Sequence, residues 1–221
     1  RRRHTRYWRD WSSDVCSSDL SHLHKQACRP QSPEKFDATR EFIIKALKAG
    51  IIEPSQAESW SQIHLQPKAD GKWRFCCDFR YLNENTKSMG WPLPNIRQML
   101  ERIGSRKPRY FAVLDLTQGY YQAAISVKSR PLTAFRTADG LYQWKRLPMG
   151  LKGAPAHFQH AMQHKILSDL LYSVCEVYLD DIIVYAETEE QFLANLKKVL
   201  ERLRKFNIRS EEHTSEFQSR Q

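Results

Sequence analysis

The sequence predicts an α+β fold, because apolar residues alternate in some stretches, recur at helical spacing in others, and are separated by short turns. Hairpin turns are indicated at Asp70-Gly71 and Asp139-Gly140, where turn-forming pairs separate strand-like runs. A third turn is predicted at Asp180-Asp181, between two runs of aliphatic and aromatic residues. Helical segments are interspersed with these hairpins, so we expect an antiparallel sheet packed on helices and not a doubly wound parallel fold.

The first half of the chain contains two helical patterns and two or three strands. A helix is predicted from Ser32-Pro33 to Gly50, and a shorter one ends at Gly104. Residues 61–66 and 72–79 read as the paired strands of the first hairpin. The helical faces are expected to bury Phe36, Ile43, Ile44 and Leu47 in the first helix and Ile96, Met99, Leu100 and Ile103 in the second.

The second half starts with residues 110–114, a continuous apolar run typical of a strand buried on both faces. Strands are then predicted over 133–137 and 141–146, and a helix opens at residues 153–155. A capping box at residues 188–191 predicts the start of the last helix. The apolar faces of these two helices are Phe158, Met162, Ile166 and Leu170, and Phe192, Leu196, Val199, Leu200 and Leu203.

The composition favours a folded domain with a polyanionic partner. The chain has 221 residues, 41% of them hydrophobic, and a net charge of +10, which suits nucleic acid and also suits an ordinary basic protein. Five cysteines, with Cys76 and Cys77 adjacent, do not indicate a disulfide framework and favour a reducing compartment. No apolar run is long enough to span a membrane, and the basic N-terminus lacks the apolar stretch of a secretory signal.

Three carboxylates carry the strongest chemical signal. Asp115 ends the apolar run 110–114, and Asp180 and Asp181 stand at the predicted hairpin. If the two strand ends converge, these groups could hold two divalent ions ~3.5–4 Å apart, which would clamp the attacking and leaving oxygens of a phosphoryl transfer. The alternative is an ordinary solvated turn at Asp180-Asp181, with Asp115 capping a strand end.

Cationic and aromatic residues elsewhere fit the same chemistry. Lys68 and Arg74 flank the Asp70-Gly71 turn, where they could bind a triphosphate or simply be solvated. Tyr120 and Tyr121 follow Asp115 closely and are either core aromatics or ligand contacts. Residues 147–155, LPMGLKGAP, form a Gly/Pro loop whose glycines would let a nucleic-acid backbone approach.

In this order and spacing, the segments resemble the fingers and palm of a reverse transcriptase of the long-terminal-repeat retrotransposon kind, the Ty3/gypsy type. The resemblance covers about residues 34–208 and includes LDLTQGYYQ, LPMGLKGAPAHFQ and YLDD. The segments that carry it are 50–55, 73–83, 114–122, 147–159 and 178–181.

The resemblance implies a role for each matching residue. Asp115, Asp180 and Asp181 would be the catalytic metal ligands for two Mg²⁺ ions, which Mn²⁺ could replace. Residues implied to bind the deoxynucleotide are Lys68, Arg74, Tyr120 as the filter against a 2′-hydroxyl, and Met149, where many retroviral relatives have Gln. Residues implied to contact template or primer are Pro155, Phe158, Gln159 and Tyr178.

The implied function is RNA-directed DNA polymerisation from a retrotransposon polyprotein, with protease, RNase H and integrase as natural neighbours and cytoplasmic particles as the location. Residues 34–209 are expected to form the fingers and palm. Residues 1–33 and 210–221 are expected to be disordered, and they resemble translated adapter sequence, so we interpret them as artefactual. Because no thumb is expected, we predict that the chain alone polymerises little.

Two alternatives stay open. The chain could be a non-catalytic nucleic-acid-binding remnant of a decayed element, although three intact carboxylates argue against decay. It could also be a structural or interaction module, which would make every motif coincidental. A dependence on Mg²⁺ distinguishes the enzyme from a simple nucleic-acid binder.

Overall fold

A computed structural model describes residues 24–27, 29–69, 71–87, 90–210 and, for the backbone alone, 218–219. Most of the terminal segments 1–33 and 210–221, predicted to be disordered, lies outside these residues. The described elements form two compact units. Unit 1 comprises Gly90–Gln122 and the described residues from Pro155 onward, and unit 2 comprises the described residues before Gly90 together with Ala123–Ala154.

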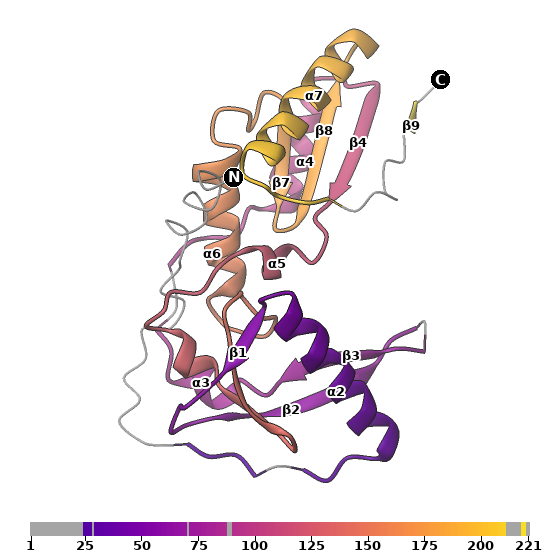
Figure 1. Ribbon diagram of the computed structural model, residues 1–221. Coiled ribbons are helices and arrows are strands. Elements are labelled where there is room, and N and C mark those ends of the chain that lie inside the picture. Colours follow the sequence, from indigo (N-terminus) through magenta and orange to yellow (C-terminus); the bar gives the residue numbers. More distant parts are fainter. Residues whose placement is uncertain (1–23, 28, 70, 88–89, 211–217, 220–221) are drawn as a thin grey trace. The chain divides into compact units, whose positions relative to one another are not determined.

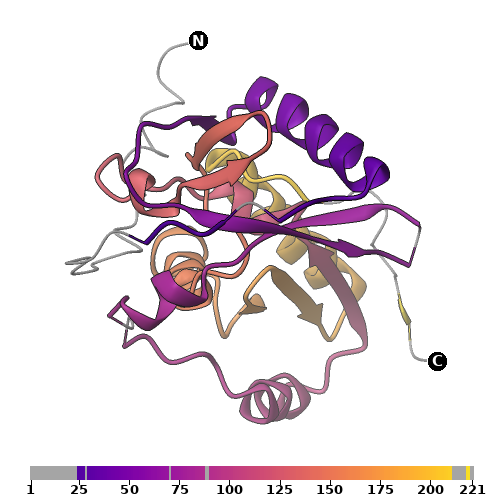
Figure 2. The same cartoon turned by 90° about the horizontal axis from the view of Figure 1, so that it is seen from below.

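Unit 2 is built on one five-stranded sheet with the order β1-β6-β5-β2-β3. The β2–β5 pair is parallel, whereas the other neighbouring pairs are antiparallel, so the sheet is mixed where an antiparallel one was predicted. Helix α2 lies along this sheet (Figure 2). The bounds are α2 Pro33–Lys48, β1 Ile52–Pro54, β2 Ser61–Pro67, β3 Trp73–Cys77, α3 Arg80–Glu84, the 3-10 turn η1 Arg130–Thr133, β5 Phe135–Thr137 and β6 Gly140–Trp144.

Helix α2 confirms the predicted position but turns a different face to the core. Ile43 and Ala46 are buried, whereas Ile44 is 60% exposed and Leu47 is also exposed. The ring of Phe42 stacks on a core phenylalanine of β3, with 4.1 Å between ring centroids. This aromatic contact fixes the rotation of the helix about its axis. The apolar pattern therefore predicted the position of the helix correctly, but it predicted the buried face only in part.

Unit 1 is built on an antiparallel sheet with the order β7-β8-β4-β9. Figure 1 shows helix α7 on one side of its strands and α4 on the other. The bounds are α4 Ile96–Ser105, β4 Tyr110–Asp115, α5 Gly119–Gln122, α6 Ala154–Ala161, the π-helical turn η2 Met162–Ile166, β7 Cys175–Tyr178, β8 Asp181–Ala186, α7 Glu189–Lys205 and β9 Gln218–Ser219.

Strand β4 was predicted to be buried on both faces, but only one of its faces is buried. Ala112 and Leu114 are buried, but Val113 is 42% exposed. On the Val113 face, Met99 and Ile103 of α4 pack near Phe111 and cover only the start of the strand. Asp115, which ends β4 on the same face, is half-buried.

The four-residue spacing from Phe158 onward is explained by the π-helical turn. A straight α-helix advances 3.6 residues per turn, so residues four apart drift by about 40° at each step. The wider turn at Met162–Ile166 offsets this drift, and Phe158, Met162 and Ile166 are all buried as predicted. The helix thus keeps Phe158, Met162 and Ile166 on one buried seam.

Helix α7 begins at the predicted capping box. The hydroxyl oxygen of Thr188 accepts a hydrogen bond from the backbone N–H of Gln191 at 3.3 Å. Phe192, Val199 and Leu203 are buried, whereas Leu200 is exposed. Across the part of the chain that the structure describes, we find no helix long and apolar enough to cross a membrane.

Candidate active site

The aspartate hairpin joins β7 to β8 in unit 1. Tyr178 pairs with Asp181 in the ladder, so the two connecting residues are Leu179 and Asp180. The predicted turn at Asp180-Asp181 is therefore wrong by one residue. Leu179 adopts a φ of 55°, a left-handed conformation that costs a residue with a Cβ about 1–2 kcal/mol. Hairpin loops of this length need such a φ, and they normally place Gly, Asn or Asp there.

Strand register brings Asp115 opposite Asp181. The two residues are directly paired in the antiparallel β4–β8 ladder, so their side chains lie on the same face of the sheet. The backbone N–H of Leu116 donates to the carbonyl of Asp180 at 3.1 Å, which ties the turn to the end of β4. Among the described residues, however, no three acidic, histidine or cysteine side chains gather as a metal-binding group. The structure assembles a facing pair with Asp180 beside it, and the predicted three-ligand site stays a prediction.

Negative charge is concentrated at this hairpin. Burial and the neighbouring Asp180 carboxylate raise the pKa of Asp181 above its ordinary value. Burial, followed by the charge of Asp180 and the nearby Tyr178, raises the pKa of Tyr120 to about 12. Tyr120 is consequently a neutral phenol at physiological pH, and its hydroxyl lies within electrostatic reach of Asp180.

Tyr120 and Phe158 form one aromatic contact beside the acids. Their ring centroids are 5.1 Å apart with an interplanar angle of 31°. Phe158 is only 2% exposed, so its ring supports Tyr120 from below. The template contact predicted for Phe158 stays a prediction, and in this structure its side chain is buried against Tyr120.

Gln159 was also predicted to contact template or primer, and this role stays a prediction. Gln159 is fully buried at 0% exposure. Its Oε1 accepts the backbone N–H of Leu179 at 2.6 Å, and its Nε2 donates to the carbonyl of Val177 at 3.0 Å. Both ends of the amide are therefore used by the hairpin. Tyr178 and Pro155 are half-buried, and their predicted contacts with nucleic acid stay predictions.

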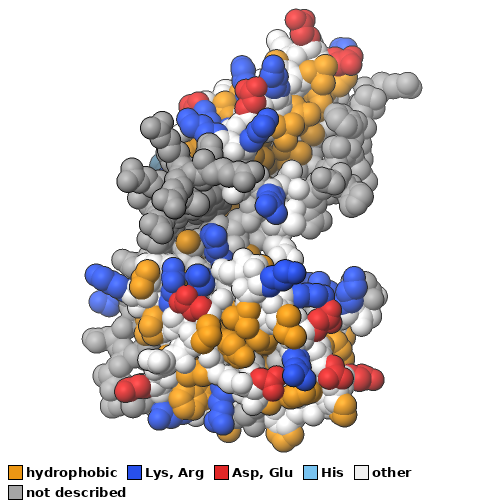
Figure 3. Space-filling model, viewed as in Figure 1, with side chains coloured by type: hydrophobic (Ala, Val, Ile, Leu, Met, Phe, Trp, Pro, Cys, Tyr) orange, Lys and Arg blue, Asp and Glu red, His pale blue; other side chains and the backbone are white. Residues whose placement is uncertain are grey.

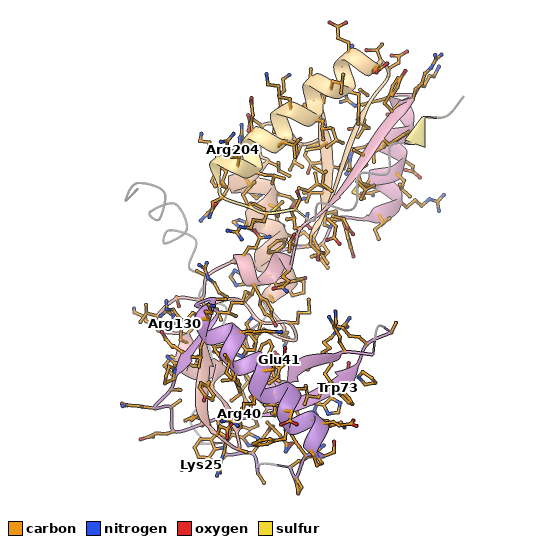
Figure 4. The ribbon with its side chains drawn as sticks, turned by 45° about the vertical axis from the view of Figure 1, so that its right-hand side comes forward. Lys25, Arg40, Glu41, Trp73, Arg130 and Arg204 are labelled. Carbon is orange, nitrogen blue, oxygen red and sulfur yellow. The ribbon has the colours of Figure 1, made fainter. Side chains whose placement is uncertain are left out.

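In unit 2, Lys68 and Arg74 line one hollow of about 420 Å³ together with Gln66, Pro67 and Ala69. Both basic side chains are exposed, and they come from the two arms of the β2–β3 hairpin. Trp73, labelled in Figure 4, begins the second arm and receives the ammonium of Lys35 at 5.2 Å from its ring centroid. The hairpin thus places Lys68 and Arg74 at one recess, and their predicted contact with a triphosphate stays a prediction.

Three comparisons with known proteins place this geometry in a family. Residues 66–220 match the family described as "Reverse transcriptase (RNA-dependent DNA polymerase)". The chain belongs to the reverse transcriptase family. The predicted kinship with retrotransposon reverse transcriptases is confirmed by two Drosophila melanogaster relatives. The chain is 39% identical over 180 residues to the Retrovirus-related Pol polyprotein from transposon opus. It is 35% identical over 208 residues to the corresponding polyprotein from transposon 412.

This reverse transcriptase chain spans only a small part of those relatives. The opus match covers 79% of the chain and 18% of the relative, and the 412 match covers 86% and 17%. Among solved structures, the foamy viral protease-reverse transcriptase in complex with dsDNA is similar with a TM-score of 0.82 and 25% identity. That likeness covers 95% of this chain and 42% of the solved one, and it confirms the predicted fingers and palm fold.

One residue that supports the loop carrying Met149 was not predicted. Asn83 in α3 donates from Nδ2 to the carbonyl of Gly150 at 2.8 Å and accepts from the N–H of Lys152 at 2.7 Å. These bonds hold the loop in which Gly150 has a φ of 94° and Met149 is 51% exposed. Asn83 belongs to a segment that carries the family resemblance, but no role was predicted for it.

Proposed function

We propose that this chain carries the nucleotidyl-transfer centre of an RNA-directed DNA polymerase, which joins a deoxynucleotide to the 3′-hydroxyl of a primer. One observation carries the proposal. Asp115 and Asp181 face each other at the ends of paired strands, with Asp180 in the connecting turn, inside a chain of the reverse transcriptase family. Among the described residues, no other two acids face each other across paired strands next to a turn and an aromatic residue.

The carboxylates suit divalent magnesium. Mg²⁺ prefers hard oxygen ligands and is usually held by one or two carboxylates together with substrate phosphates, so a facing pair suffices as the protein's share. The raised pKa of Asp181 reflects repulsion and desolvation that a bound cation would relieve. Asp115, Asp180 and Asp181 would hold the metal, which when bound activates the primer hydroxyl and neutralises the departing pyrophosphate.

The remaining roles follow from side-chain chemistry. Lys68 and Arg74 share a recess and would bind the triphosphate, Arg74 through its planar fork and Lys68 as a point charge. Tyr120, held by Phe158 and kept neutral, would stand under the sugar and exclude a 2′-hydroxyl. The exposed Met149 would contribute apolar surface to the nucleotide pocket.

Nucleic acid is the proposed polymeric partner. The net charge is +10, and Lys and Arg side chains are spread over the visible face of each unit (Figure 3). Such a surface binds phosphate backbones without reading sequence, and its affinity falls steeply with salt. The similar foamy viral enzyme was solved with dsDNA, which supports a duplex as the ligand of this chain.

The test combines metal binding with single-nucleotide addition. Electron paramagnetic resonance would measure Mn²⁺ bound to the chain, and a labelled DNA primer annealed to RNA would report addition of one deoxynucleotide with Mg²⁺. Asp180→Asn should weaken Mn²⁺ binding and abolish addition. The matched control is Asp37→Asn, which removes an exposed carboxylate on α2 and should change neither.

Unchanged Mn²⁺ binding or unchanged addition in Asp180→Asn would overturn the proposal. Duplex binding that needs no divalent ion, in a wild-type chain that binds no Mn²⁺, would instead favour the non-catalytic nucleic-acid binder.

A further inference from the structure

The side-chain amide of Gln159 occupies the position that a further strand beside β7 would take. Strand β7 is at the edge of its sheet, so the outward backbone groups of its last residues have no ladder partner. The carbonyl of Val177 and the N–H of Leu179 point to the same side because they are two residues apart in an extended chain. Gln159 supplies one donor and one acceptor to this pair, at 3.0 and 2.6 Å.

The shorter of these two hydrogen bonds is made to the residue with the strained backbone. Leu179 holds a left-handed φ of 55°, and the Gln159 bond is made to the N–H of that same residue. Asp180 follows directly, and its carbonyl is fixed by the N–H of Leu116. The position of the Asp180 carboxylate therefore depends on a turn conformation that its own sequence disfavours and that Gln159 stabilises from outside.

We propose that Gln159 is a positioning residue that holds the Leu179-Asp180 turn in its strained form and thereby places Asp180 beside the Asp115–Asp181 pair. The purpose of this placement rests on the proposed function. The clamp, meaning the two hydrogen bonds from Gln159 to Val177 and Leu179, is a property of the hairpin alone. Gln159 touches no reacting atom and acts through the backbone of its neighbours.

Hydrogen exchange tests the clamp directly. In Gln159→Met, which keeps the length of the side chain and removes both hydrogen bonds, the Leu179 amide should exchange about tenfold faster or more. The matched control is Gln163→Met, the same substitution one turn further along the helix. The Gln163 side chain accepts a hydrogen bond from the indole N–H of Trp91 at 3.0 Å rather than from the hairpin, so its loss should leave the Leu179 amide unchanged.

Metal affinity tests the placement. Residues that orient metal ligands typically contribute about 10–100-fold to metal affinity, so Gln159→Met should weaken Mn²⁺ binding by about tenfold. If the wild-type chain binds no Mn²⁺ at these acids, the proposed function fails, whereas the exchange measurement still decides on the clamp. A direct template contact would instead raise the dissociation constant for primer–template and leave Leu179 exchange unaltered.

A second substitution separates positioning from general stability. Asn tolerates the left-handed region, so Leu179→Asn should relieve the strain that Gln159 opposes. Mn²⁺ affinity in the double variant Gln159→Met/Leu179→Asn should then lie closer to wild type than in Gln159→Met alone. The double variant also serves if Gln159→Met does not fold. Additive losses of affinity, or a protected Leu179 amide in folded Gln159→Met, would overturn the proposal.

Discussion

Gly119 is the residue whose replacement tests the packing around Asp180 most directly. It lies in α5, just after β4, and is buried. An alanine Cβ at this position would lie 3.0 Å from the Cβ of Asp180, 3.3 Å from the Cζ of Phe158 and 3.4 Å from the Cβ of Leu116. The backbone of Gly119 is not in the left-handed region, so alanine meets only this steric conflict. The Cβ of Asp180 cannot rotate away, because its position follows from the backbone.

The magnitude follows from two opposing effects. Alanine is favoured over glycine in a helix by about 0.5–1 kcal/mol. Overpacking a close site costs about 1–3 kcal/mol, and a 3.0 Å contact between two Cβ atoms belongs in the upper part of that range. We therefore expect Gly119→Ala to lower the free energy of unfolding by about 1–2 kcal/mol. Gly104→Ala in α4 meets no atom within 4 Å, so it should raise that free energy by about 0.5–1 kcal/mol.

Urea unfolding of the three chains, followed by circular dichroism, measures both values. The free energies of unfolding of the two alanine variants should differ from each other by about 2 kcal/mol, with Gly119→Ala below wild type and Gly104→Ala above it. Mn²⁺ affinity gives a second measure, since a displaced Asp180 should bind metal more weakly in Gly119→Ala alone. Equal stabilities for Gly119→Ala and Gly104→Ala would refute the claim that Gly119 exists to make room for Asp180.

Three further substitutions probe other parts of unit 1. Arg102→Met removes the guanidinium that lies 2.9 Å from the buried Glu176 carboxylate. Urea unfolding should show that the free energy of unfolding falls by about 2–3 kcal/mol. This loss is smaller than for a fully enclosed pair because the Arg102 side chain is 41% exposed. Asp181 has a raised pKa, so its ionisation opposes folding; Asp181→Asn should be more stable than wild type at pH 7, and this advantage should vanish as the pH falls below 3.8, the ordinary value. Added Mg²⁺ at ten times its dissociation constant should stabilise wild type by about 1.4 kcal/mol and the Asp181 variant by less, as thermal unfolding would show. Thr188→Ala removes the cap that accepts from Gln191 and should cost about 1 kcal/mol in urea unfolding.

The elements of the fold were largely predictable because their signals are local. The structure begins a helix at the Thr188 capping box, as predicted. It also forms a hairpin at the Asp139-Gly140 signal, although Gly140 pairs with Thr137 and the two connecting residues are Ala138 and Asp139. Helix faces were less predictable. Ile44 and Leu100 fit the apolar pattern but are exposed, because the choice among neighbouring apolar stripes depends on partners distant in sequence.

The site was predictable in its acids and less so in its supports. Asp115 and Asp181 were expected to converge, and strand register makes them direct neighbours. The turn was displaced by one residue because Asp is a common turn former, whereas the ladder closes at Tyr178 and leaves Leu179 in the loop. Nothing in the local sequence marks Leu179 for a left-handed φ, since the stabilising contact comes from Gln159, 20 residues away.

Two side-chain amides show why the role of a residue close to a catalytic centre is hard to assign from sequence. Gln159 bonds the turn that contains Leu179, and Asn83 bonds the loop that contains Gly150, each with one donor and one acceptor. Both loops include a residue with positive φ, where a regular ladder cannot continue. An amide side chain has the hydrogen-bonding capacity of a peptide group, so it can complete such a loop without adding a strand. The same capacity would suit a base or a sugar, and only burial distinguishes the two uses. For Gln159 burial is complete and both ends of the amide are bonded to the hairpin, which favours the structural use.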